Sequence, residues 1–123
     1  MKFPLRYLAT GILSYLAVRI LEELASGLQG QIRRTEVYSI HGFSHVFFGI
    51  GLASAVLFWR PKSSARLVML IVLIGGIAWE LYEGLWLKGE PLDSIEDVML
   101  AILSAYTFLC WERRDTAANT PLP

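Results

Sequence analysis

The chain has little of what many binding and catalytic sites are built from. It holds one cysteine, Cys110, in 123 residues, so an internal disulfide and a Cys-x-x-Cys metal or redox motif are both excluded. Cys110 falls in an apolar segment, where it acts as a small apolar filler. The sequence has no cluster of basic residues interleaved with aromatics, which argues against nucleic acid as a partner. The HExxH motif is also absent.

Apolar residues, in contrast, are abundant. They make up 54% of the chain, and the mean hydropathy is +0.48. Soluble chains usually contain about 45–50% apolar residues. The segment 67–84 begins as an apolar run and then carries Glu80 and Glu83 on one helical face. Because about 20 apolar residues cross roughly 30 Å of hydrocarbon, we expect a one-domain membrane protein in contact with the lipid bilayer.

The apolar segments are separated by short polar connections. Ser39 is a candidate N-cap for the second helix, and Ser63 or Ser64 for the third. Gly27 or Gly30 is expected to end the first helix. The predicted fold is all-α, a polytopic bundle of four transmembrane helices with short loops. The predicted helices span residues 5–27, 40–59, 66–87 and 95–111, and residues 112–123 form a polar cytoplasmic tail.

The basic residues predict the orientation of these four spans. Both termini and the connection 60–66 fall on one side of the membrane, which carries Lys2, Arg6, Arg60, Lys62, Arg66, Arg113 and Arg114. The other side carries Arg33, Arg34 and Lys88. Loops rich in Lys and Arg stay in the cytoplasm, so we expect a multi-pass protein with both termini cytoplasmic.

Each predicted helix carries an ionisable residue at the same depth. Counted from the cytoplasmic ends, Arg19, His45, Glu80 and Asp97 each lie 14 residues inward, or about 21 Å along a helix. A second tier one turn further out is formed by Glu22 or Glu23, His41, Glu83 and Asp93. Small residues follow at steps of four, as Gly49 and Ala53 after His45, and Ala101 and Ala105 after Asp97. Such stripes let membrane helices approach closely, so the pattern predicts a polar cluster in the outer third of the bundle.

The residue types and spacings in this cluster suit a divalent metal. His41 and His45 are spaced i,i+4, Glu80 and Glu83 i,i+3, and Asp93 and Asp97 i,i+4. All six are predicted metal ligands. Imidazole with carboxylate suits zinc, iron or manganese, and a ligand set with less histidine suits magnesium or calcium.

Two simpler explanations compete with parts of this assignment. Asp93 and Glu96 match a helix capping box. Arg19 has the spacing of intrahelical ion pairs with Glu22 and Glu23.

Three functions are compatible with the cluster. A metal with an open position would support hydrolysis of a lipid or its headgroup, with Glu80 and Glu83 as catalytic carboxylates and Glu83 as base. Alternatively, the charges fix helix register in an accessory subunit of a larger membrane complex or in a homo-oligomer. A third function is ion or proton translocation, although the sequence offers few polar residues toward the cytoplasmic half.

Three motifs carry a family resemblance. They are HGFSH at 41–45, GGIAWELYEG at 75–84 and LDSIEDV at 92–98. Together they resemble the YjdF-like small bacterial inner-membrane proteins and, more distantly, the VanZ-like ones. The resemblance covers about residues 40–108 and implies location in the bacterial inner membrane. It also implies functional importance for His45, Glu80, Glu83, Asp93 and Asp97. Since no reaction is assigned to that family, the resemblance implies site residues and no particular chemistry.

Overall fold

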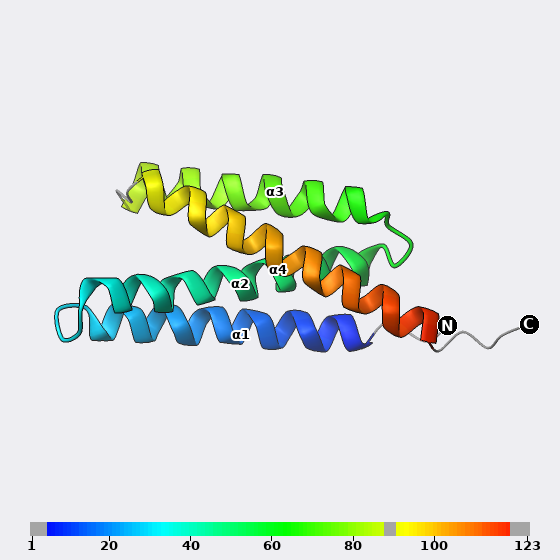
Figure 1. The fold of residues 1–123 in the computed structure, drawn as a ribbon, viewed down its shortest axis with the longest axis horizontal. Helices are drawn as coiled ribbons and strands as arrows, with labels where there is room; N and C mark the ends of the chain where they lie inside the picture. Colours follow the sequence, from blue (N-terminus) through cyan, green and yellow to red (C-terminus); the bar gives the residue numbers. More distant parts are fainter. Residues whose placement is uncertain (1–4, 88–90, 119–123) are drawn as a thin grey trace, which may run out of the picture.

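The computed structural model describes residues 5–87 and 91–118, except for the side chains at 34, 35, 38, 86, 87, 91–94, 117 and 118. Four helices, α1 (Leu5–Leu28), α2 (Arg34–Trp59), α3 (Ala65–Tyr82) and α4 (Pro91–Ala118), account for nearly all of it (Figure 1). A short π-helical turn, η1 (Glu83–Leu87), continues α3. The described part contains no β-strand, so the predicted all-α class is confirmed.

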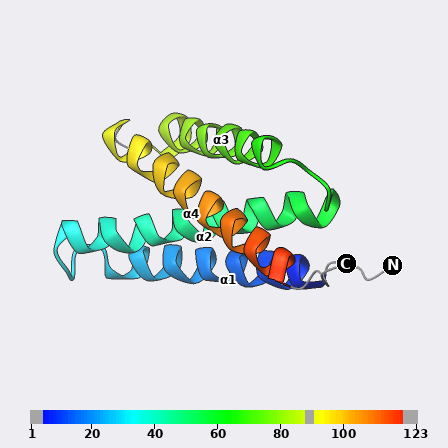
Figure 2. The same ribbon diagram turned by 45° about the vertical axis from the view of Figure 1, so that its right-hand side comes forward.

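The central element is α2. Figure 1 and Figure 2 show α1 running alongside α2, with α3 on the far side of α2 from α1. Helix α4 crosses obliquely from the end of α3 to the beginning of α1, packing on α2 and α3 along the way. The first and last described turns therefore lie at the same end of the molecule as the α2–α3 connection.

Small residues allow α2 and α4 to approach closely. Ala53 and Ala105 have no exposed surface, and Ala101 is 1% exposed. A methyl group added at Gly49 would collide with the backbone carbonyl oxygen of Ala101. The two predicted stripes of small residues therefore do lie at a helix contact, which positions the polar residues that precede them.

The structure differs from the predicted boundaries at several helix ends. Helix α2 begins at Arg34, so Ser39 lies inside the helix and does not cap it. Ser64 does cap α3, because its Oγ accepts a hydrogen bond from the Leu67 N–H at 3.2 Å. Helix α1 ends at Leu28, and Gly30 follows with φ +86°, a conformation that favours glycine. An apolar run in the sequence therefore predicts the middle of each helix, and it does not predict where the helix begins or ends.

The structure also differs from the prediction of a polar tail at residues 112–123. Helix α4 continues to Ala118, so residues 112–118 are helical and do not form a tail. Glu112 is 7% exposed and accepts a hydrogen bond from the Tyr7 hydroxyl at 2.7 Å. Arg6 reaches the same carboxylate at 2.9 Å and Asp115 at 3.3 Å. These four residues, the Arg6–Glu112 clamp, join the start of α1 to the end of α4.

Two stretches are long and apolar enough to cross a membrane. They are Ser39–Trp59 in α2 and Ala65–Leu85 in α3 with its π-helical turn. Helices α1 and α4, which the sequence also predicts to span the bilayer, do not meet this measure over their described residues. A membrane association is therefore supported for two helices, and the count of four spans stays a prediction.

Candidate metal centre

Three helices bring one buried histidine and two carboxylates together. His45 on α2 has its Nε2 3.2 Å from Oδ2 of Asp97 on α4. Its other ring nitrogen, Nδ1, lies 3.9 Å from Oε1 of Glu80 on α3. One ligand atom from each of the three residues lies within 4.8 Å of the other two. This inner group is thus compact enough to surround one metal ion.

The inner group is almost fully removed from solvent. The side chains of His45, Asp97 and Glu80 are 5%, 9% and 10% exposed. His45 Nε2 and Glu80 Oε1 are buried, yet neither makes a hydrogen bond of good geometry with any described residue. Buried polar atoms are normally satisfied, and leaving one unsatisfied costs about 1–3 kcal/mol. A bound cation would supply the missing partner for both atoms.

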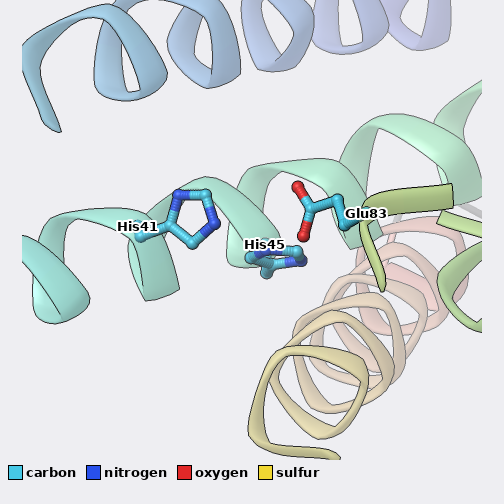
Figure 3. A group of neighbouring side chains, drawn as sticks. All are labelled: His41, His45 and Glu83. Atoms are coloured by element: carbon cyan, nitrogen blue, oxygen red, sulfur yellow. The ribbon is translucent and has the colours of Figure 1, made fainter. Parts of the chain in front are cut away.

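A second, outer group shares His45. His41, one helical turn earlier on α2, and Glu83, at the start of η1, join His45 with ligand atoms within 4.8 Å of one another. Figure 3 shows the Glu83 carboxylate directed from the end of α3 toward the two imidazole rings. The ring centroids of His41 and His45 are 5.4 Å apart. The outer group is more open, because His41 and Glu83 are only partly buried.

Supporting contacts hold the outer residues in place. Oε1 of Glu22 on α1 lies 3.1 Å from Nδ1 of His41. The same oxygen accepts a hydrogen bond from the Ser44 hydroxyl at 2.6 Å. On the other side, the Trp79 indole N–H donates to Oε1 of Glu83 at 2.8 Å. Carboxylate contacts of this kind fix the orientation of metal-ligating histidines.

The position of Glu83 coincides with a change of helix type. Helix α3 ends at Tyr82, and the five residues Glu83–Leu87 form a π-helical turn. Single π-helical turns are rare and occur often at functional sites. The wider turn carries Glu83 at its first position, beside the two histidines.

Five of the six predicted metal ligands are brought together: His41, His45, Glu80, Glu83 and Asp97. The sixth, Asp93, has a side chain outside the described residues, so its role as a ligand stays a prediction.

The structure corrects the predicted place of Arg19 in the cluster. Its side chain is 60% exposed and 3.9 Å from Glu23, so it lies outside the cluster and forms the intrahelical pair. Glu22 is the residue of α1 that contacts the cluster, which residue spacing alone left undecided between Glu22 and Glu23. The sequence analysis did not predict a role for Ser44, and its position between the two histidines in the sequence was the one signal that could have indicated it.

A groove of about 320 Å³ lies between α2 and α4 beside the inner group. It is lined by Gly42, Phe43, Val46 and Leu100 together with the polar residues Ser39 and Glu96. Asp97 also lines the groove and so connects it with His45. An extended apolar group lying in the groove would have its end close to the carboxylate.

The donor atoms decide which metals fit. The inner group offers one imidazole and two carboxylates, and the outer group two imidazoles and one carboxylate. Mixed nitrogen and oxygen donors of this kind suit zinc, iron and manganese, and the two-histidine, one-carboxylate set occurs in zinc hydrolases and in iron(II) sites. With no thiolate in either group, the chain's own donors favour these metals over copper(I).

Comparison with known protein families, with curated proteins and with solved structures gives no match to the chain. The resemblance to YjdF-like and VanZ-like membrane proteins therefore stays a prediction that rests on the three sequence motifs. The interpretation of the site rests on its own geometry.

Proposed function

We propose that this chain is an integral membrane protein of four spans that holds a divalent metal ion between His45, Glu80 and Asp97, in the outer third of the bilayer. One observation carries the metal assignment: His45 Nε2 and Glu80 Oε1 are buried where three helices meet, and neither makes a hydrogen bond of good geometry with a described residue, although Nε2 lies 3.2 Å from Oδ2 of Asp97. Cations are the partner that would satisfy an imidazole nitrogen and a carboxylate oxygen at once.

The distribution of apolar side chains supports the four spans. On α4, Ile95, Met99 and Leu103 are more than half exposed, whereas Asp97 on the opposite face is buried. Helix α1 likewise buries Ser14 and exposes a set of large apolar residues, namely Leu5, Leu8, Ile12, Leu13, Leu16, Ile20 and Leu24. Soluble proteins rarely expose apolar surface of this extent. Hydrocarbon around the helices would cover it.

The groove between α2 and α4 favours a lipid as the substrate of this centre. The apolar part of its lining, Phe43, Val46 and Leu100, suits an acyl chain, and Asp97 at its side would bring the polar end of that lipid to the metal. A divalent ion lowers the pKa of bound water and polarises an ester or phosphoryl oxygen. Glu83, next to His45, would act as the base, and Glu80 would remain a ligand. The proposed reaction is therefore hydrolysis of a lipid or its headgroup.

The metal is tested first, by elemental analysis. The full chain, solubilised in mild detergent, is stripped with a chelator, incubated with Zn²⁺, Mn²⁺ or Fe²⁺ in turn, and desalted. We expect at least one equivalent of one of these metals to stay with the wild type and less than a tenth of that amount with His45→Ala. Glu36→Gln is the matched control, because Glu36 is exposed near the start of the same helix. Wild-type protein without bound metal would refute the proposal.

The hydrolysis is tested separately. Metal-loaded protein is mixed with vesicles of phosphatidylglycerol and phosphatidylethanolamine, and released headgroup or fatty acid is measured. We expect turnover that falls at least a hundredfold in Glu83→Gln. A loaded centre that leaves both lipids intact would remove the hydrolytic function and favour an accessory role in a larger membrane complex.

A further inference from the structure

From the shared position of His45, we infer that the centre takes two divalent cations side by side, the second one between His41, His45 and Glu83. This inference rests on the proposed metal site and extends it. Its first basis is geometric. The outer group satisfies the same 4.8 Å condition as the inner one, and the two groups have His45 in common. Two ligand sets that share a residue place their ions next to each other.

The ring of His45 has a nitrogen on each side, and each can serve one ion. Nε2 lies 3.2 Å from Oδ2 of Asp97, and Nδ1, on the other edge of the ring, lies 3.9 Å from Oε1 of Glu80, so Glu80 lies beside the nitrogen that would serve the second ion. When both nitrogens bind a cation, the ring must give up its N–H proton. Filling the second position is therefore expected to release a proton from His45 to the solvent.

Glu22 prepares the second position from outside. By holding Nδ1 of His41, it leaves Nε2 as the nitrogen available to a cation. The Ser44 Oγ lies 2.6 Å from this oxygen of Glu22 and 2.6 Å from the carbonyl oxygen of His41, so its single proton is shared between the two acceptors and the carboxylate is held in place. Glu22 is a positioning residue here and not a ligand.

The charge of the cluster also favours two ions. Glu22, Glu80, Glu83 and Asp97 bring four carboxylates to the two histidines. One divalent cation leaves two of these four negative charges unbalanced, whereas two cations, with the ring of His45 deprotonated, leave one. Uncompensated charge in a poorly solvated site is costly.

The test uses Mn²⁺, because its paramagnetism reports on pairs. Metal-stripped full-length protein in detergent is dialysed against increasing Mn²⁺ concentrations, and bound metal per chain is measured together with the electron paramagnetic resonance spectrum. We expect two equivalents at saturation and the spectrum of two interacting ions. We expect Glu83→Gln to retain one equivalent with the spectrum of an isolated ion. We expect Glu22→Gln to weaken the second equivalent about 10–100-fold.

Glu23→Gln is the matched control for Glu22→Gln, since Glu23 is the exposed neighbour on the same helix and pairs with Arg19. It should bind both equivalents with wild-type affinity. A wild type that saturates at one equivalent would overturn the two-ion inference and leave the proposed single site standing. A wild type that binds no Mn²⁺ would also overturn the two-ion inference, and the proposed single site would then stand or fall on the retention of Zn²⁺ or Fe²⁺. The stoichiometry of the wild type decides the question even if a variant fails to fold.

Discussion

Among single residues, Tyr7 has the clearest structural role outside the candidate metal centre. Its hydroxyl donates to Glu112 at 2.7 Å and also accepts a hydrogen bond from Arg6 at 2.9 Å. Glu112 is buried, so its charge depends on these two partners. Tyr7 therefore adds a polar contact between α1 and α4, while its ring belongs to the buried apolar cluster that includes Phe108 and Leu109.

Replacing Tyr7 with phenylalanine should lower the free energy of unfolding by about 1–2 kcal/mol, because Glu112 loses one hydrogen bond and keeps Arg6. The measurement is thermal unfolding of the detergent-solubilised protein, followed by circular dichroism. Tyr15→Phe is the control, since Tyr15 is 64% exposed. Equal effects of the two substitutions would show that the hydroxyl of Tyr7 adds no stability.

At this scale, the sequence predicted which ionisable residues meet on α2, α3 and α4, because helical rise fixes the depth of each one. It could not decide how α1 is rotated about its own axis. Packing of Ser14 and Ala25 against α2 settles that rotation, turning Glu22 inward and Arg19 outward. The spacing of the charges on α1 is equally compatible with a rotation that turns Glu22 inward and with one that turns Arg19 inward.

Among the helices, the contact between α2 and α4 governs the geometry of the site. Nε2 of His45 and Oδ2 of Asp97 are held 3.2 Å apart. Each of these residues lies one helical turn before the point where Gly49 approaches the backbone of Ala101. The predicted stripes of small residues located this contact correctly. The helix ends were predicted less well, since polar residues such as those at 34–38 and 112–118 continue a helix without changing its apolar pattern.

Gly49→Ala should destabilise the protein by about 1–3 kcal/mol, because the added methyl group has no room between α2 and α4. The same substitution should reduce metal retention, since the two helices must separate. Thermal unfolding and elemental analysis check both effects. For comparison, Gly11→Ala places a methyl group where no atom lies within 4 Å, so stability should be unchanged or slightly higher. An unaffected Gly49→Ala protein would contradict the close approach.

For the whole molecule, the main consequence of the fold is the arrangement of its two ends. The Arg6–Glu112 clamp and the α2–α3 connection lie at one end, and the candidate metal centre lies toward the other. If all four helices span the membrane, the first and third connections lie on the opposite side of the membrane from the termini. The α1–α2 connection at 29–33 should therefore face the exterior.

This topology is checked by cysteine labelling in intact cells, in a Cys110→Ser background. A thiol introduced as Gln31→Cys should react with an impermeant maleimide, and one introduced as Thr116→Cys should react only after the cells are opened. Labelling of Thr116→Cys in intact cells would contradict the predicted orientation. Labelling of both, or of neither, would contradict the four spans.

The crossing path of α4 also constrains the order of events during synthesis. Helices α1 and α2 can pair as soon as residue 59 has left the ribosome, but Asp97 and Glu112 follow tens of residues later. Until α4 is inserted, His45 has no Asp97 and Arg6 has no Glu112. If the proposed site holds a metal, it can do so only after Asp97 has joined His45, so a chain truncated before α4 should retain none.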